Sequence, residues 1–258
     1  MIRNLLIITG VGFVLALVGI TGAFALVGND VRKHDWTWVI DDDAAGDSSF
    51  RIQRGEVAPE VTRNIEWAGG DRLMVDVPGK VTYVQGAQAG IRVTGPKDIV
   101  DSIRFNDGRL TMISDDNHDR GYIRWSGSGI RVWSESEALR IEVTAPAVNR
   151  FEMGDNGELN IRGYDQPTLD VVINGEGSVK ADGQAQRVSV VSSGDGDASL
   201  RRVMTTDATV RSTGRGDVSV APTGRADIEI AGHGDVYLAR NPAQLNQSIT
   251  GWGEVEMD

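Results

Sequence analysis

A glycine-based repeat in the C-terminal part constrains this chain more than any other feature. The signal Gly-x-Gly recurs at intervals of 19, 20, 18 and 19 residues. Its five copies begin at Gly175, Gly194, Gly214, Gly232 and Gly251. A related stretch, GDNGELNI, begins 21 residues earlier at Gly154 and reads as a degenerate sixth copy. A period near 19 residues with a fixed internal pattern predicts a repeat architecture, in which each unit packs on the next.

Each copy contains two short stretches in which apolar and polar residues alternate. The stretch after the glycines has an apolar column of Val179, Ala198, Val218, Val236 and Val255. The stretch before the glycines has one apolar column of Leu169, Val188, Ala208, Ala226 and Leu245, and another of Val171, Val190, Val210 and Ile228 that Gln247 interrupts. A period of two residues is typical of a β-strand with one face inward and one outward. Each copy therefore predicts two strands joined at a glycine corner.

Two short strands and a corner cannot bury an apolar row alone, so the copies must stack. Stacking at strand spacing, about 4.8 Å, turns each column into a buried ladder and pairs every strand with its neighbours. Glycine at both sides of the corner permits positive φ and lets successive backbones approach closely. Because the inward residues are small or medium aliphatics, we expect a narrow interior without a lumen. The prediction is an all-β fold, a parallel β-helix (solenoid) with coils of about 19 residues.

The stretch before the repeats, residues 67–112, is less regular. Strand-like runs, including Ile99–Phe105, are broken by turn signals, and Asn106–Gly108 between two apolar runs predicts a hairpin. Terminal repeats tend to be atypical because they cover an otherwise open core. We therefore expect N-terminal coils or a capping sheet in this stretch.

The N-terminus carries an apolar segment long enough to cross a membrane. Leu5–Val27 is 23 residues without a charge, and a helix of about 20 residues spans a hydrocarbon core of about 30 Å. This length favours an uncleaved anchor, whereas Ala23–Ala25 resembles a signal-peptide cleavage site and gives a secreted protein if cleaved after Ala25. Because an N-terminal apolar segment is the usual export signal, we expect the domain on the periplasmic or extracellular side. Trp36 and Trp38 follow at a position typical of the membrane interface or of a first strand.

These features divide the chain into three parts. Residues 1–28 are the predicted transmembrane anchor or signal peptide, 29–66 a linker and lead-in segment, and 67–258 the β-helix domain. An insertion at 114–137 interrupts that domain. Asp41–Asp43, together with the small residues that follow, predicts a solvated loop within the linker.

The order of the motifs also resembles a known family. The opening RLMVDVPGKVTYVQG, the segments GIRVTGP and DGRLTM, and the repeated pattern GxGDVxL are similar to the GIN domain, an auto-transporter adhesin head domain. The resemblance covers about residues 67–258. It implies a right-handed parallel β-helix in a cell-envelope protein, and it brings no active-site motif to this chain.

The residues directly after the glycine corners are candidate metal ligands. Asp197, Asp217, Asp235 and Glu254 occupy this position, so in-register stacking places four carboxylates in one column about 5 Å apart. Like charges at this spacing repel unless water, arginines or a cation compensate them. One interpretation is that each carboxylate caps backbone N–H groups at its corner, which is ordinary turn chemistry. The other interpretation is a divalent cation site, with Ca²⁺ as the bound ion.

The insertion 114–137 is the second candidate site, in this case for binding. It contains Tyr122, Arg124, Trp125 and Trp133, and aromatic and arginine side chains are enriched at binding surfaces. The structural alternative is that the insertion covers the solenoid, with Trp125 and Trp133 packed inward.

Composition narrows the classes of function. The chain has no cysteine, which excludes disulfides and thiolate metal sites, and its three histidines are far apart. A formal net charge of −11 argues against nucleic acid as a partner. The preferred hypothesis is a non-enzymatic, membrane-anchored β-helix protein for adhesion, scaffolding or ligand display, with a glycan or an envelope protein as its ligand. The alternative is a carbohydrate-active β-helix that binds or cleaves glycans with the stacked carboxylates.

Overall fold

The chain forms two compact units in the computed structural model, which describes residues 36–42, 50–113, 120–126 and 128–257. The larger one, the solenoid unit, comprises the described residues of 58–117 and 135–258. The smaller one, the small unit, comprises those of 1–57 and 118–134. Within the described ranges no helix is long and apolar enough to cross a membrane. The predicted anchor or signal peptide, 1–28, lies outside them.

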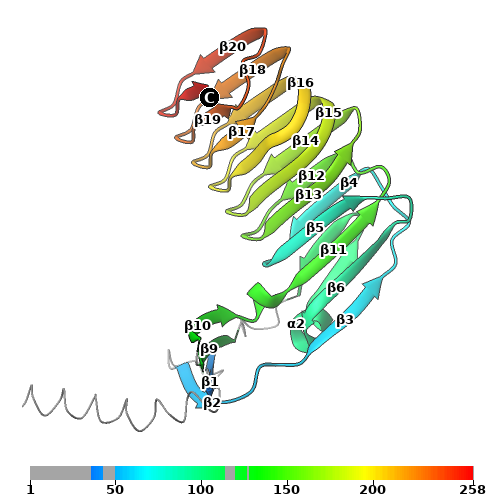
Figure 1. Ribbon diagram of the computed structural model, residues 1–258, viewed down its shortest axis with the longest axis vertical. Helices are drawn as coiled ribbons and strands as arrows, with labels where there is room; N and C mark the ends of the chain where they lie inside the picture. Colours follow the sequence, from blue (N-terminus) through cyan, green and yellow to red (C-terminus); the bar gives the residue numbers. More distant parts are fainter. Residues whose placement is uncertain (1–35, 43–49, 114–119, 127, 258) are drawn as a thin grey trace, which may run out of the picture. The chain divides into compact units, whose positions relative to one another are not determined.

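The strands of the repeat region stack in parallel, in the register that the sequence columns predict. They are β12 (Arg150–Met153), β13 (Glu158–Asp165), β14 (Thr168–Ile173), β15 (Ser178–Ser192), β16 (Ala198–Ser212), β17 (Val218–Val220), β18 (Arg225–Ile230), β19 (Val236–Leu238), β20 (Gln244–Ile249) and β21 (Val255–Met257). Val179 pairs with Ala198, which pairs with Val218. Leu169 pairs with Val188 in the column before the corners. Figure 1 shows these strands as successive rungs, and the β-solenoid is confirmed.

The degenerate copy at Gly154 is a coil of the same stack. Leu159 of β13 pairs in parallel with Val179 on one side and with Val81 of β5 (Lys80–Gln85) on the other. Phe151 of β12 likewise pairs in parallel with Val171 on one side and with Leu73 of β4 (Arg72–Asp76) on the other. Strands β4 and β5 therefore add a further coil to the N-terminal end of the stack.

The corner glycines are required by close backbone contact and not by an unusual φ. A Cβ atom on Gly214 would lie 1.8 Å from the carbonyl oxygen of Gly194, and one on Gly232 would lie 2.0 Å from that of Gly214. Cβ atoms in ordinary structures do not come this close to backbone. The glycines of the described residues that have positive φ lie outside the five Gly-x-Gly corners. The expectation of positive φ at the corners is therefore wrong, and the expectation of close approach is confirmed.

The N-terminal end of the solenoid unit mixes parallel and antiparallel pairs. Its further elements are β3 (Glu60–Ile65), β6 (Gly90–Pro96), α2 (Lys97–Ser102), β7 (Ile103–Asn106), β8 (Arg109–Met112), η1 (Ser136–Ala138) and β11 (Arg140–Ala145). Strand β11 pairs parallel to β5 and antiparallel to β6, which pairs antiparallel to β3. Strand β8 pairs parallel to β4 and antiparallel to β7. Residues 67–112 thus supply one coil and most of the strands that flank it.

The predicted hairpin is confirmed, whereas the strand predicted over Ile99–Phe105 is wrong in its first part. Asp107 and Gly108, between β7 and β8, have positive φ of 47° and 75°, as the favoured two-residue hairpin turn requires. Residues Lys97–Ser102 form the helix α2, which begins after Pro96 and buries Ile99 and Val100. Proline is common at a helix start, and adjacent apolar residues suit a short buried helix as well as a strand.

The core at the N-terminal end contains larger side chains than the small and medium aliphatic residues that the repeats predict. Tyr83, Phe151 and Tyr164 are buried. The ring centroids of Tyr83 and Phe151 are 4.9 Å apart, and those of Phe151 and Tyr164 are 6.1 Å apart, both edge to face. The Tyr83 hydroxyl donates to the Ala145 carbonyl at 2.8 Å, and the Tyr164 hydroxyl donates to that of Thr168. Burial raises the pKa of Tyr83 to about 12 and also raises the pKa of Tyr164.

The small unit is a four-stranded antiparallel sheet in the order β10-β9-β1-β2. Its strands are β1 (Trp36–Asp42), β2 (Phe50–Arg54), β9 (Gly121–Ser126) and β10 (Gly129–Ser134). The segment 29–66, which we expect to be a linker, thus contains three strands, and Asp41 and Asp42 end β1 instead of lying in a loop. Strand β9 from the insertion 114–137 pairs with β1. Local patterns do not reveal this pairing because the two strands are far apart in the sequence.

Candidate functional site

The carboxylates after the corners form a hydrogen-bonded column, here called the acid ladder: Asp197, Asp217, Asp235 and Glu254. Oδ1 of Asp197 accepts the backbone N–H of Asp217 at 2.9 Å, and Oδ1 of Asp217 accepts that of Asp235 at 2.9 Å. Oδ1 of Asp235 accepts the N–H of Glu254 at 2.8 Å. Each aspartate therefore caps a backbone N–H, as in the turn-chemistry interpretation, but at the corner of the next coil and not at its own.

The acid ladder also sets the electrostatics of its surroundings. The negative charge of Asp217 is the main reason that the pKa of Tyr237 is raised. In the described ranges no group of three or more His, Asp or Glu side chains is arranged to hold a metal ion. Binding of Ca²⁺ to the acid ladder stays a prediction.

The opposite corners of the coils form a groove, which we call the solenoid groove. It has a volume of ≈ 520 Å³ and is lined by Asp165, Gln166, Pro167, Gln184, Ala185, Gln186, Met204, Thr205, Thr206, Ala221, Thr223 and Arg240. Buried small residues (Ala185, Thr205 and Ala221) form its floor, and longer exposed side chains form its walls. Because this position falls once in every coil, five successive coils contribute, which gives a length of about 20 Å at strand spacing.

The polar side chains of the groove are held in rows along the stack. Gln184 Nε2 donates to Asp165 Oδ1 at 2.8 Å, and the backbone N–H of Asp165 donates to Gln85 Oε1 at 2.9 Å. The hydroxyl of the exposed Thr223 donates to the carbonyl of the buried Thr205 at 3.1 Å. Met204 interrupts the polar wall, with 59% of its surface exposed. The groove thus offers amide, carboxylate and hydroxyl groups beside one apolar contact.

The binding residues predicted in the insertion lie in the small unit, on both faces of its sheet. Tyr122 is buried and stacks on the half-buried Trp133, with ring centroids 5.5 Å apart, and the exposed Arg131 guanidinium lies 5.2 Å from the Trp133 ring. In an antiparallel sheet, directly paired residues share a face and sequence neighbours alternate. Arg124 pairs with Arg131 and so shares the face of Tyr122 and Trp133, whereas Trp125 pairs with Ile130 on the other face. The four residues therefore do not form one surface.

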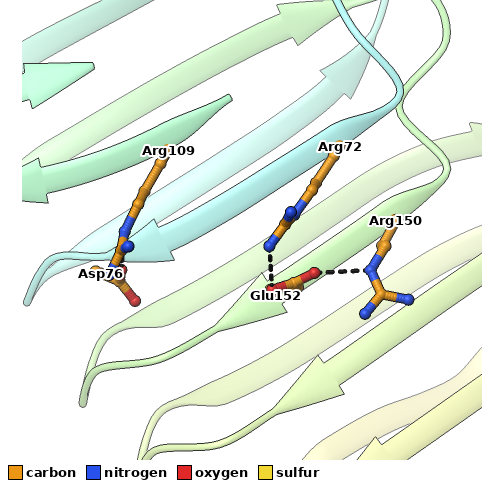
Figure 2. A network of polar contacts seen from close by, with 5 residues as sticks. All are labelled: Arg72, Asp76, Arg109, Arg150 and Glu152. Atoms are coloured by element: carbon orange, nitrogen blue, oxygen red, sulfur yellow. Dashed lines mark hydrogen bonds and ion pairs between the residues drawn. The ribbon is translucent and has the colours of Figure 1, made fainter. Parts of the chain in front are cut away.

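Ion pairs link the outer faces of β4, β8 and β12 at the N-terminal end of the solenoid. Figure 2 shows Glu152 between two arginines, with its oxygens 2.8 Å from Arg72 Nη2 and 2.7 Å from Arg150 Nε. Asp76 Oδ2 accepts from Arg109 Nε at 2.6 Å. Burial acts to raise the pKa of Glu152, but the hydrogen bonds from Arg150 and Arg72 outweigh it and hold that pKa below its usual range. Because both Glu152 oxygens are engaged, we assign this cluster a structural role.

Sequence reasoning missed the solenoid groove because β15 and β16 run through the bend without a break. Gly163 and Gly183 lie beside this bend, but the next coil has Val203 at that position, so no recurring glycine marks the corner in the sequence. One available signal was Met204, an exposed apolar residue at the position where the preceding coil carries Gln184.

These features define the solenoid unit as a short parallel β-solenoid with stacked glycine corners and an open surface groove. Residues 71–242 match the family described as "Putative auto-transporter adhesin, head GIN domain", and the chain belongs to this family. The match confirms the family that the sequence motifs resemble.

Three solved structures are similar to this chain, and the first of them shares its fold. A "putative adhesin" from Bacteroides fragilis is 19% identical, with a TM-score of 0.59, and the match covers 78% of this chain and 97% of that one. A "putative lipid binding protein" from Parabacteroides distasonis is 15% identical, with a TM-score of 0.43 and coverage of 77% and 96%. A "putative adhesin" from Parabacteroides merdae is 15% identical, with a TM-score of 0.39 and coverage of 77% and 96%. Comparison with curated proteins gave no match.

Proposed function

We propose that this protein is a non-enzymatic, adhesin-like protein of the cell envelope that binds an extended, hydroxyl-rich ligand, a glycan, in the solenoid groove. The observation that carries this proposal is the row of polar side chains that five successive coils place along one groove. A ligand with hydroxyl groups at regular intervals matches such a row better than a compact ligand does.

The chemistry of the groove supports a glycan over an added peptide strand. A peptide that joins a sheet needs an unpaired backbone edge, whereas the backbone at the groove is already paired between coils, as Gln184 with Met204 and Ala185 with Thr205. Side-chain amides, hydroxyls and a carboxylate remain exposed, and these groups both donate to and accept from sugar hydroxyls.

An envelope location is supported by the uncharged segment Leu5–Val27 and by the family description, which refers to an adhesin head. A structural neighbour is also described as an adhesin. The proposed arrangement is a membrane anchor at the N-terminus with both units on the outer side of that membrane.

The glycan-cleaving alternative finds less support. Glycoside hydrolysis generally needs two carboxyl groups placed on either side of the scissile bond. In the acid ladder the Oδ1 atoms of Asp197, Asp217 and Asp235 instead accept backbone hydrogen bonds within the stack. These acids maintain the coil corners, away from the groove-lining residues.

The test is a glycan array probed with the full chain in detergent, followed by calorimetry on the strongest ligand. The double variant Gln186→Ala/Thr206→Ala removes two exposed polar groups from the groove walls. We expect its affinity to fall about tenfold, since two neutral hydrogen bonds each contribute about 0.5–1.5 kcal/mol.

A matched control is Thr209→Ala/Gln247→Ala, which removes one threonine and one glutamine that are exposed outside the groove. This variant should bind as the unmodified chain does. Absence of binding across cell-wall and host glycans would refute the proposal, and so would an equal loss in both double variants.

A further inference from the structure

Of the two faces of the sheet in the small unit, the more apolar one is the less tightly packed. By pairing register, one face contains Trp38, Ile52, Ile123, Trp125, Ile130 and Val132, and we call it the apolar face. Ile130 is 67% exposed, Val132 65% and Ile52 53%. Among the described side chains on this face, Arg54, paired with Trp38, is the charged one. Ile130, Val132 and Ile52 lie on the edge strands β10 and β2, and Trp38, Ile123 and Trp125 on the central strands are half-buried. Exposed apolar residues gathered on one face of a domain mark an interaction surface.

The other face of the sheet is the one that is packed. Val39 is 8% exposed and Tyr122 is 1% exposed, and Tyr122 stacks on Trp133. The exposed Arg124 and Arg131 lie on this same face. A sheet with one buried face normally carries polar residues on the other. Here the outward face is aliphatic and aromatic, so burial within the small unit does not explain its composition.

We infer that the apolar face lies against the surface of a lipid bilayer, beside the anchor; this inference rests on the anchored location in the proposed function. The uncharged segment ends at Val27, and eight residues separate it from Trp36 at the start of β1. Eight extended residues span at most about 29 Å, so the sheet stays within reach of the membrane that the segment crosses.

The composition of the face fits the bilayer interface better than a protein partner. Tryptophan is enriched at membrane interfaces because its ring is apolar and its indole N–H is polar, and Trp38 and Trp125 supply two such rings. Exposed aliphatic side chains such as Ile130 and Val132 suit the acyl boundary of such an interface. The small unit therefore holds the first folded segment of the chain against the membrane surface.

The chain has no cysteine, so single-cysteine variants can be labelled at one site only. Ile130→Cys and Val132→Cys place an environment-sensitive fluorophore on the apolar face. Arg131→Cys, between them on the opposite face, is the matched control, and Met204→Cys in the solenoid groove is a second. Each labelled full chain is reconstituted in phosphatidylcholine–phosphatidylglycerol vesicles and quenched either by nitroxide-labelled lipid or by aqueous iodide.

We expect nitroxide lipid to quench the labels at positions 130 and 132 about threefold more than those at 131 and 204, since an interfacial apolar face enters the bilayer by about 5–10 Å. Iodide should show the reverse order. Labels at 130 and 132 that are as accessible to iodide as that at 204 would overturn the inference. Protection from iodide without quenching by lipid would also overturn it, because a second copy or another segment of the chain would then cover the face.

Vesicle flotation separates failure of this inference from failure of the proposed function. A chain that floats with the vesicles but has iodide-accessible labels retains its anchor and loses only the proposed face contact. A chain that does not float lacks the membrane anchor, and both the anchored location and the face contact are then wrong. Glycan binding by the solenoid groove is measured separately and does not depend on either result.

Discussion

In the repeat coils, glycine corners lie so close that each would-be Cβ of Gly194, Gly214 and Gly232 meets the backbone of the preceding coil. At the N-terminal end of the same solenoid, the would-be Cβ of Gly154 meets the side chain of Asp76 instead, 2.0 Å from its Oδ1. The repeat core consists of aliphatic ladders, and the N-terminal core contains a cluster of three aromatic rings.

The difference follows from what each coil meets. A coil in the middle of the repeats meets nearly the same backbone on both sides, so the same small residue is required at each corner. The coil of β4 and β5 pairs in parallel with β8 and β11, and these two strands in turn form antiparallel pairs with β7 and β6. The repeat pattern therefore ends here, and larger side chains and ion pairs take its place. The two regions should therefore respond differently to substitution.

The largest effect is expected in the aromatic core. Phe151→Ala removes a fully buried ring between Tyr83 and Tyr164, and we expect the free energy of unfolding to fall by about 3–5 kcal/mol. Val210→Ala in the repeat core should cost about 2 kcal/mol, because less apolar surface is lost. Urea denaturation followed by circular dichroism measures both. Equal losses in the free energy of unfolding would show that the aromatic core and the repeat core are equally sensitive to a truncated side chain.

A methyl group at a repeat corner should have the next largest effect. The Cβ of Gly214→Ala would lie 1.8 Å from the Gly194 carbonyl oxygen, so the backbone must shift, at a cost of about 3 kcal/mol. Gly90→Ala is the control, since nothing lies within 4 Å of its Cβ position and its φ is ordinary. The control should change unfolding by less than about 0.5 kcal/mol. If Gly214→Ala is as stable as the unmodified chain, contact with the carbonyl of the preceding coil is not the reason for glycine at this corner.

The ion pairs of the N-terminal end should make stability depend on pH. Arg150 and Arg72 lower the pKa of Glu152 from 4.5, so the stability it contributes is present above that unfolded-state value and is lost as pH falls through the folded-state pKa. Glu152→Gln should lower the free energy of unfolding by about 2 kcal/mol at neutral pH. The variant should also lack the part of the stability loss at acidic pH that comes from protonation of Glu152.

Glu142→Gln is the matched control for Glu152. Glu142 lies 3.7 Å from Arg92, and both side chains are mostly exposed, so the change should be below about 0.5 kcal/mol. Melting temperatures measured from neutral pH down to mildly acidic pH provide the comparison. An identical acid response in the Glu152 variant and the unmodified chain would contradict a role for this cluster.

The smallest effect is expected in the acid ladder. Asp217→Ala removes the acceptor for the Asp235 N–H and should cost about 1 kcal/mol, whereas Asp217→Asn keeps an Oδ1 acceptor and should be nearly neutral. Melting temperature measures both, with and without Ca²⁺. A calcium-dependent rise that both variants abolish would instead support cation binding by the acid ladder.

Sequence patterns predicted the parts of the solenoid in which every coil repeats the same contacts. The pairing of Val179 with Ala198 and the coil at Gly154 followed from period and alternation. The turn at Asp107–Gly108 followed from local chemistry. The first part of Ile99–Phe105 was predicted as a strand but belongs to the helix α2, because a short apolar run is compatible with either structure.

The candidate sites were less accessible to sequence reasoning. The acid ladder was identified because its residues sit at fixed offsets from the glycines. The solenoid groove and the apolar face were not, because each arises where residues from several distant strands come together. For Tyr122, Arg124, Trp125 and Trp133, proximity in sequence was misleading, since strand alternation sends Trp125 to the opposite face.

By itself, the sequence determined the coil period, the inward columns and the small residues at the corners, because each of these depends on contacts between equivalent positions of adjacent coils. Only the tertiary structure decided the packing of aromatic rings in the N-terminal core and the pairing of β1 with β9. It also decided which polar residues share the solenoid groove. These features depend on contacts between segments that do not repeat and lie far apart in the chain, so no local period records them.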